Sequence, residues 1–550
     1  MTTPVPELPE SSPEATSTAQ GIDQHELEVA LRVLASLHEL DDEHPDFIAV
    51  RRATAKMFKS VKKNRRDEKR DAIANADRSV IANTATGAPD RIDDETRGVQ
   101  LAAITTAPTA GTLIKSRPCY ICKQHYTQVD AFYHQLCPSC AAKSHAKRDA
   151  RTDLTGKRAL LTGGRAKIGM YIALRLLRDG AHTTITTRFP RDAVRRFSSL
   201  PDSGDWLHRL KIVGIDLRDP AQVIGLAETV AAAGPLDILI NNAAQTVKRS
   251  PGSYAPLAEA ELEPLPDGPV PEMITFGHTN DAHPQALAAS VAAHPLLQRA
   301  AAVAPAAAAL GLAPLGRTGG VSDADANAEL VGSELLGAAL AGAGLTPGEL
   351  SADELSGLAL AAGSSSLSRL AAGTAIDAGG LVPDTHHENS WTQAVQDVDP
   401  LEMLEVQLCN TTAPFLLVSR LRPSLAAGAS AAASGRAYIV NVSAMEGVFA
   451  RGYKGPGHPH TNMAKAALNM LTRTSGKEML TDGILMTSVD TGWITDERPH
   501  PTKVRLAEEG FHAPLDLVDG AARVYDPVVR GEAGEDLSGV FLKDYAPSPW

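Results

Sequence analysis

Residues 157–188 constrain the fold of this chain more than any other stretch. The segment begins with KRALLTGGRAKIG, a short apolar run followed by a glycine-bearing turn, and continues as MYIALRLLRDGAHTTITTR, a helical run and a second strand-like run. Such a turn lets the backbone approach a pyrophosphate, and the helix from about Ile168 directs its positive end toward that anion. The order predicts the βαβ opening of a dinucleotide-binding sheet.

Four further strand-like runs follow the first two. They are LKIVGIDLRD, LDILINNAA, RAYIVNVSAMEG and GILMTSVDTGWITDE. Because they alternate with helical runs, the sequence predicts an α/β fold with a Rossmann-type, doubly wound parallel sheet. The sheet is divided between residues 151–250 and 391–550, since about 140 residues rich in Ala, Gly and Pro, 251–390, separate the fourth strand from its helix. This insertion is either a lid over the ligand-binding edge or a poorly ordered elaboration.

Several motifs, in this order, resemble the short-chain dehydrogenase/reductase family. TGGRAKIG (Thr162 to Gly169) resembles the family's TGxxxGxG turn, NNAA (Asn241 to Ala244) its NNAG, and NMAKAALNMLT the helix with its catalytic lysine. The resemblance covers residues 156–250 and 391–545. It implies an oxidoreductase that acts on a small organic carbonyl or alcohol. Lys167 replaces the middle glycine, so we expect a reshaped turn, because the backbone angle there suits glycine better.

The resemblance also implies the cofactor site. Arg188 ends the second strand, where NAD-selective members have an acidic residue for the ribose hydroxyls. Arg165 and Lys167 add two cations, so NADP is favoured over NAD; the alternative is that these side chains face solvent. The predicted dinucleotide contacts are Gly163, Arg165, Lys167, Ile168, Gly169, Arg188, Asp216, Asn242, Ala243, Lys465 and Thr495.

The family's chemistry uses a Ser that polarises the carbonyl, a Tyr that moves the proton, a Lys that lowers the Tyr pKa and an Asn that supports a water relay. Asn410 and Lys465 match two of these roles. Thr461 stands at the tyrosine position, and its hydroxyl has too high a pKa and too short a reach to replace a phenol. Ala444 stands at the serine position, with Ser443 one place earlier, which on a straight strand points the other way.

The loop VFARGYKGPGHPH, which precedes Thr461, offers replacement acids. It brings Tyr453 and two histidines, His458 and His460, either kind of which transfers protons near neutral pH in a suitable environment. Relocation of the acid, loss of dehydrogenase chemistry and an altered reaction, such as an isomerase or lyase, are all open. Loss of chemistry would make the chain a dinucleotide-binding sensor or scaffold. The predicted catalytic set is Asn410, Ser443, Tyr453, Thr461 and Lys465.

Two Cys-x-x-Cys pairs predict a metal site. Cys119 and Cys122 form the first pair, and Cys137 and Cys140 the second. Two such turns direct four thiolates at one ion and leave no open position for substrate, so a structural Zn site is predicted. An iron–sulfur cluster and a redox-active dithiol are the alternatives. If the chain is a sensor or scaffold, this module is expected to dock a protein or nucleic acid.

The remaining segments and the overall charge complete the prediction. We expect a disordered tail at 1–22, helices and a linker at 23–114, and a zinc-ribbon-like module at 115–150. The basic run KMFKSVKKNRRDEKR is interpreted as a solvated helix face rather than a nucleic-acid contact, and the net charge of -12 disfavours nucleic acid and anionic membranes. With no apolar segment suited to span a membrane and five cysteines, we expect a cytoplasmic protein with a small-molecule substrate. Homo-oligomers are expected through the long helices that follow Asn410 and Thr461.

Overall fold

The computed structural model falls into two compact units, Met1–Ala76 and Asp77–Trp550. The structure describes residues 21–89, 91, 106–249, 251–276, 351–360, 375–384, 386–494 and 497–550. Nearly all of the predicted tail, much of the predicted insertion and Thr495 therefore lie outside the described residues. None of the helices in these ranges is long and apolar enough to cross a bilayer.

The first unit contains the helices predicted after Gln24. Helix α1 covers Gln24–Ser36, a short 3-10 turn covers Leu37–Glu39, and α2 covers Pro45–Ala82 and so extends into the second unit. The Asp23 carboxylate caps α1 by accepting hydrogen bonds from the backbone N–H groups of the helix's first turn. Among residues 21–76 none is buried, so this unit has no core of its own.

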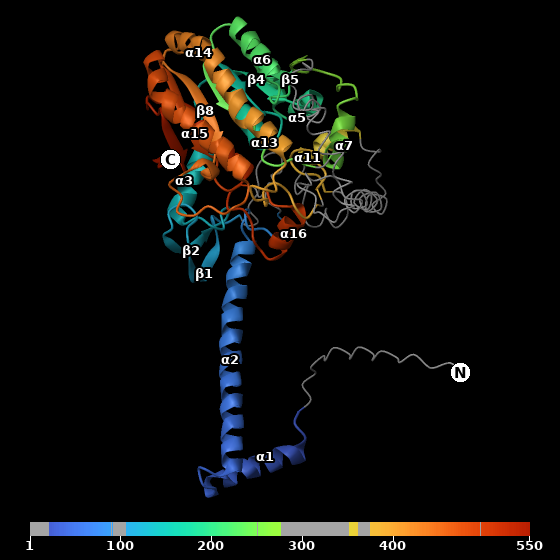
Figure 1. Cartoon of the computed structure of the whole chain (residues 1–550), viewed down its shortest axis with the longest axis vertical. Helices are drawn as coiled ribbons and strands as arrows, with labels where there is room; N and C mark the ends of the chain where they lie inside the picture. Colours follow the sequence, from blue (N-terminus) through green and yellow to red (C-terminus); the bar gives the residue numbers. More distant parts are fainter. Residues whose placement is uncertain are drawn as a thin grey trace, which may run out of the picture. The chain divides into compact units, whose positions relative to one another are not determined.

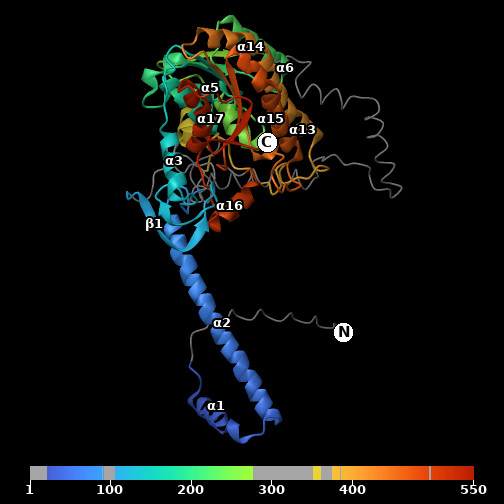
Figure 2. The same cartoon turned by 90° about the vertical axis from the view of Figure 1, so that its left-hand side faces the viewer.

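A nine-stranded sheet organises the second unit (Figures 1 and 2). Its order is β11-β10-β9-β8-β6-β3-β4-β5-β7, and every neighbouring pair is parallel except β10 and β11. The strands are β3 Arg158–Leu161, β4 His182–Thr187, β5 Leu210–Gly214, β6 Ile238–Asn241, β7 Glu272–Thr275, β8 Ala437–Ser443, β9 Ile484–Asp490, β10 Val540–Lys543 and β11 Ala546–Ser548. The predicted doubly wound parallel sheet is confirmed.

Helices cover both faces of the sheet, which explains why its central strands read as continuous apolar runs. Every residue of β6, β8 and β9 is buried. Helices α4 and α17 pack on one face, and α6 and α14 on the other, with α15 beside β8 and β9. The five helices named are α4 Lys167–Arg178, α6 Pro220–Ala232, α14 Ala413–Ala431, α15 Pro459–Met479 and α17 Leu517–Glu532. Two further helices of this half of the chain are α13 Pro400–Gln407 and α16 His500–Glu508.

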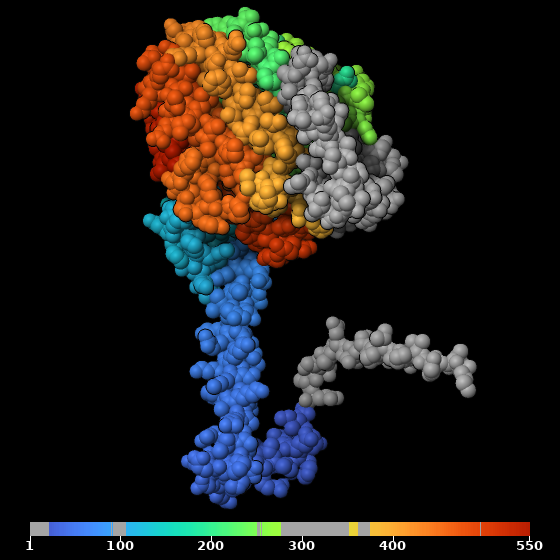
Figure 3. All heavy atoms as spheres, in the orientation of Figure 1, coloured from blue at the N-terminus to red at the C-terminus, as the bar shows by residue number. Residues whose placement is uncertain are grey.

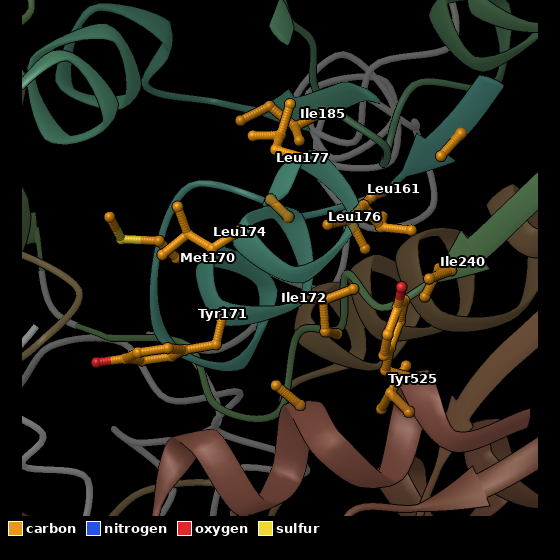
Figure 4. Close-up of a cluster of buried hydrophobic side chains, with 14 of the residues drawn as sticks. Leu161, Met170, Tyr171, Ile172, Leu174, Leu176, Leu177, Ile185, Ile240 and Tyr525 are labelled. Carbon is orange, nitrogen blue, oxygen red and sulfur yellow. The ribbon is translucent and has the colours of Figure 1, made fainter. Parts of the chain in front are cut away.

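The core on the α4 face fixes the helix that follows the glycine-bearing turn. Figure 4 shows Ile172 of α4 beside the ring of Tyr525 of α17, with Ile240 of β6 on the other side of that ring. Ile172 and Ile240 are fully buried. Because α4 packs against both the sheet and α17, the position of its first turn relative to the ends of the strands is fixed.

The described parts of the insertion are built onto the first half of the sheet. Helix α7 covers Pro251–Ala260, and β7 extends the sheet beyond β5. Helix α11, Ala352–Leu360, packs against α7 and against α5, Pro190–Ser198. Together with Ile376 these helices enclose a small apolar cluster of their own.

The cysteine-bearing segment forms a small subdomain on the same unit. Strand β1, Thr109–Pro118, pairs antiparallel with β2, His125–Asp130, and α3, Pro138–Arg148, follows. Its apolar core is continuous with Ile494 and Leu515, which belong to the segment between β9 and α17. A buried ion pair also joins this subdomain to the segment before α17: the Arg148 guanidinium lies 2.5 Å from Asp516 Oδ1.

Candidate dinucleotide and catalytic site

The glycine-bearing turn after β3 has the backbone geometry that a phosphate loop needs. Gly163 (φ +68°) and Lys167 (φ +51°) both adopt left-handed angles, so Lys167 takes the backbone conformation that favours glycine. A side chain at Gly169 would lie 1.9 Å from the Gly163 carbonyl oxygen. No side chain caps α4 at Ala166, and its first turn carries no acidic residue. Its N-terminal N–H groups are therefore available to an anion.

The NNAA segment after β6 holds this turn in place. Asn242 Nδ2 donates to the carbonyl oxygens of Thr162 (3.1 Å) and Gly163 (3.0 Å). The backbone N–H groups of Asn242 and Ala243 both donate to Thr162 Oγ1, each at 3.0 Å. Two segments predicted to contact the dinucleotide are thus brought together at the carboxyl ends of adjacent strands.

Two of the three predicted phosphate-binding cations contact carboxylates instead. Arg165 Nη1 pairs with Asp192 of α5, and its Nη2 donates to the Gly379 carbonyl oxygen at 2.9 Å. Lys167 Nζ lies 3.2 Å from Asp377 Oδ2. Asp377 and Gly379 both come from the insertion. The insertion therefore contacts the phosphate turn directly, a contact that the sequence did not indicate.

Arg188 and Asp216 lie further along the same edge. The Arg188 guanidinium stands over the rings of Phe189 (5.6 Å) and Tyr254 (5.5 Å). Asp216 is paired with Arg218, whose Nη2 lies 2.6 Å from Asp216 Oδ2. Burial alone would raise the pKa of Asp216, but the hydrogen bonds from Arg218 outweigh it and lower the pKa. Asp216 is ionised near neutral pH and held by its own neighbour.

Lys465 is buried on α15 and directed at the end of β8. Its Nζ donates to the Val442 carbonyl oxygen at 2.8 Å, and the residue is only 6% exposed. Burial lowers the pKa of Lys465 to about 8, and the charge of Glu446 partly opposes this. A lysine with this pKa exchanges its proton near physiological pH.

Asn410 is buried where the helix after the insertion changes its winding. It lies in a π-helical turn, Leu408–Thr412, between α13 and α14. Asn410 Oδ1 accepts from the Gln245 backbone N–H at 2.7 Å, and its Nδ2 donates to the Gln245 carbonyl oxygen at 2.8 Å. The side chain fastens the segment that leaves β6, and π-helical turns are frequent at functional sites.

Ser443 ends β8 on the face that α15 covers. Two residues earlier, Asn441 Nδ2 donates to Thr472 Oγ1 of α15 at 2.9 Å, and side chains two apart on a strand share a face. Ser443 therefore lies on the same side of the sheet as Lys465, although it is one place earlier than the family's serine. Its Oγ is buried and has no hydrogen-bond partner among the described residues.

Asp490, which the sequence analysis missed, stands directly beside Ser443. It ends β9, and the two residues are paired in the parallel register of β8 and β9. Asp490 is 5% exposed, and burial raises the pKa of its carboxyl to about 6. A carboxylate at the carboxyl end of a predicted parallel strand was the signal that could have revealed it.

The residues considered as the acid differ sharply in burial. Tyr453 is 77% exposed, and His458 stacks on Trp391 with 3.9 Å between ring centroids. His460 and Thr461, at the start of α15, are 2% and 1% exposed. Among the described residues, neither ring nitrogen of His460 has a hydrogen-bond partner. Thr461 Oγ1 has none among them either. Burial also lowers the pKa of His460.

A family model described as short chain dehydrogenase matches residues 157–263, which contain the turn, the NNAA segment and strands β3 to β6. The strand order and the placement of Lys465 and Asn410 around that match agree with it. Residues 157–263 of the chain are therefore similar to the short-chain dehydrogenases.

The proteins similar to this chain differ in how much of it they cover. An uncharacterized protein of Acanthamoeba polyphaga mimivirus is 26% identical over 430 residues, 75% of this chain and 71% of that protein. A probable oxidoreductase of Streptomyces antibioticus is 41% identical over 91 residues, 16% of this chain and 30% of that protein. The NADPH-bound carbonyl reductase from chicken fatty liver aligns with 74% of this chain and 98% of its own, at 16% identity and a TM-score of 0.38.

The four clustered cysteines form a candidate metal centre in the same unit as the nine-stranded sheet. The sulfurs of Cys119, Cys122, Cys137 and Cys140 all lie within 4.8 Å of one another, with 3.6 Å between those of Cys122 and Cys137. Zn–S bonds of about 2.3 Å in a tetrahedron place sulfurs roughly 3.8 Å apart, so this donor set fits such an ion.

The cysteine turn also contacts the segment that follows β9. The Tyr120 hydroxyl, between the first two cysteines, accepts a hydrogen bond from the Trp493 backbone N–H at 3.0 Å. Trp493 follows the left-handed Gly492 (φ +78°) and lies three residues after Asp490. The subdomain therefore supports the loop at one side of the candidate catalytic residues.

Proposed function

We propose that the chain is an NADP-dependent oxidoreductase that interconverts a small organic carbonyl and the corresponding alcohol. The observation that carries the proposal is the buried Lys465 beside Ser443, at the strand ends where the uncapped first turn of α4 begins. Ser443 Oγ and Thr461 Oγ1 are buried without partners among the described residues. Buried polar groups are normally hydrogen-bonded, so such a cluster favours a ligand. The Streptomyces relative, itself a probable oxidoreductase, agrees with this class.

The residues present are compatible with NADP. The open N–H groups of α4 suit the pyrophosphate, and the glycine at position 169 lets α4 pack closely against the turn that would hold it. Arg188, which rests on aromatic rings, is the cation we assign to the 2′-phosphate, because Arg165 is paired with Asp192. Lys465 is assigned to the nicotinamide ribose. When bound, the cofactor supplies the hydride for reduction or accepts it for oxidation.

We assign the proton to Asp490 and Ser443 in place of a tyrosine. Ser443 Oγ donates a hydrogen bond to the substrate oxygen, and Asp490, with its pKa raised to about 6, holds the proton. In reduction, Asp490 would release its proton through the Ser443 hydroxyl to the substrate oxygen, which becomes the hydroxyl oxygen of the alcohol. Asp490 is left as a carboxylate and regains its proton from water.

Hydride transfer to a panel of aldehydes, ketones and quinones tests this assignment, with NADPH absorbance as the readout. We expect Ser443→Ala and Asp490→Asn to lower kcat by about 10²-fold or more, the usual contribution of general acid catalysis. Tyr453→Phe is the matched control, because this exposed residue should leave turnover unchanged. Turnover that disappears in Tyr453→Phe and persists in Asp490→Asn would overturn the assignment and place the acid on the loop.

A second function, a dinucleotide-binding sensor without turnover, is favoured by one observation. Asp377 and Gly379 of the insertion contact the cations of the phosphate turn, so dinucleotide binding would be coupled to the position of the insertion. The threonine at position 461 agrees with lost chemistry. Tight NADPH binding with no hydride transfer to any acceptor, together with altered proteolysis of the insertion, would select this function.

We also propose that the four cysteines hold a structural Zn ion. The proximity of the four sulfurs and the shared core with Ile494 and Leu515 support it. Metal analysis of the purified protein should find one Zn per chain, and Cys119→Ser should remove it and lower the thermal midpoint. Iron with visible absorbance would indicate the cluster alternative, and no metal would contradict the proposal.

A further inference from the structure

The first unit lacks the apolar burial that a stable fold requires. Helix α1 and α2 meet only at the base of their hairpin, where Val33, Leu37 and Leu40 face Ala49 and Val50 around a shallow pocket. Figure 3 shows the part of α2 beyond this base as a single column of side chains. Helices in proteins gain most of their stability from packing against other elements, so a helix pair with so little packing needs a partner.

Apolar side chains beyond the base of the hairpin are exposed. On α2, Met57 is 61% exposed, Phe58 66% and Val61 43%. On α1, Leu31 is 57% exposed and Leu34 46%. Single exposed apolar residues are ordinary, but five on two neighbouring helices form a patch of the kind that marks a protein interface.

The spacing of these residues on α2 is that of a coiled coil. Phe47, Val50, Thr54, Met57 and Val61 alternate three and four residues apart, the a and d positions of a heptad. Helix α2 is 38 residues long, and helices much longer than 25 residues are typical of coiled coils. The face that this stripe occupies is therefore suited to another helix rather than to a small molecule.

The distribution of charge indicates which helix could pack on this face. Between Asp23 and Asp46 eight carboxylates stand against one arginine, whereas between Arg51 and Arg70 ten Lys and Arg stand against two carboxylates. Within residues 21–76 no ion pair joins an α1 carboxylate to a Lys or Arg of α2. Only Glu26 and Glu28 of these carboxylates lie in α1; the others flank it in the cap, the connecting turn and the start of α2. The acidic segment 23–46 and the basic stretch 51–70 are thus complementary but not paired within one chain.

We propose that the helical hairpin of residues 23–76 pairs with the hairpin of a second copy of this chain, forming a four-helix assembly. The heptad stripes of the two α2 helices meet at its centre. The acidic segment 23–46 of each copy, which includes α1, lies against the basic stretch of the other copy's α2. A second copy satisfies both charge patterns at once, whereas a nucleic acid would be repelled by the acidic segment and would leave the apolar stripe exposed.

A photo-reactive benzoylphenylalanine placed at Phe58 tests the pairing in the full chain. We expect ultraviolet light to yield a covalent product of twice the chain mass, and Met57→Lys with Val61→Lys to abolish it while the cofactor-binding unit keeps its thermal transition. The same photo-reactive residue at Phe449, 79% exposed on the other unit, is the control and should give no such product. Only monomeric or nucleic-acid-linked products from position 58 would overturn the proposal.

Charge reversal separates pairing between copies from pairing within one chain. One variant carries Glu26→Lys and Glu28→Lys, and the other Lys62→Glu and Lys63→Glu. Each alone should lose at least half of the crosslink at low salt, because its own helices repel. Mixing the two should restore it, since each supplies the charge that the other lacks. Failure of the mixture to exceed the separate variants would contradict the proposal.

Discussion

Replacing Asp192 by Ala tests whether the insertion is anchored through buried charge. The carboxylate lies between two guanidiniums: Arg196 Nε is 2.7 Å from Asp192 Oδ2, and Arg165 pairs with the same oxygen. Side-chain exposures are 1% for Asp192, 0% for Arg196 and 12% for Arg165. Removing one partner of such a pair leaves the others buried and uncompensated, which lowers the free energy of unfolding by about 3–5 kcal/mol. At about 2 °C per kcal/mol, the midpoint should fall by roughly 6–10 °C.

Urea and thermal unfolding, followed by circular dichroism at pH 7, measure this effect. Burial alone would raise the pKa of Asp192, but Arg196 and Arg165 outweigh it and hold the pKa at about 2. The carboxylate therefore stabilises the fold fully at pH 7, and the contribution is lost as pH falls toward 2. The exposed partner of Arg436, Asp536, is the control: its replacement by Ala should change the midpoint little. A loss below 1 kcal/mol in Asp192→Ala would refute the reasoning.

Three further predictions concern the candidate site and the metal. Because burial lowers the pKa of Lys465 from 10.5 to about 8, the unfolded state binds more protons between those pH values. The free energy of unfolding should therefore rise with pH across this window, and Lys465→Met, measured by urea unfolding, should lack the rise. If Asp490 delivers the proton, kcat for carbonyl reduction should fall as pH rises above about 6, and the pH–rate profile of Asp490→Asn should lack that step. If Tyr120 supports the loop after β9, Tyr120→Phe should raise the KM for NADPH about 5-fold, because it removes one hydrogen bond of about 1 kcal/mol. Chelation of the metal should raise the KM as well, and loss of metal without any effect on KM would refute the link.

The sequence predicted the frame of the molecule because that frame depends on local patterns. Apolar strands, the glycine-bearing turn and the helices between them are written in consecutive residues, and the parallel order follows from their alternation. The two missed strands are short: β7 reads EMIT and β11 reads APS, and neither has the length or pattern of a buried strand. Both pair at the edges of the sheet, where neighbours and not composition determine whether a strand forms.

The environment of the site residues depended on contacts that no local pattern encodes. Arg165 and Gly379 are 214 positions apart, so their hydrogen bond could not be anticipated, and the charge of Arg165 was assigned to a phosphate. Whether the Ser443 side chain lies on the α15 face of the sheet depended on the residues over which β8 runs, Ala437–Ser443. Asp490 was overlooked because its importance comes from its partner in the sheet register, not from a motif.

Binding of NADPH and NADH, followed by nicotinamide fluorescence in the wild type and in Arg188→Ala, tests the central claim most directly. We expect saturable binding with NADPH preferred, and a loss of that preference in the variant of roughly 10-fold or more, since one charge-assisted contact to the 2′-phosphate contributes about 1.5–3 kcal/mol. Absence of saturable binding for either nucleotide would contradict it.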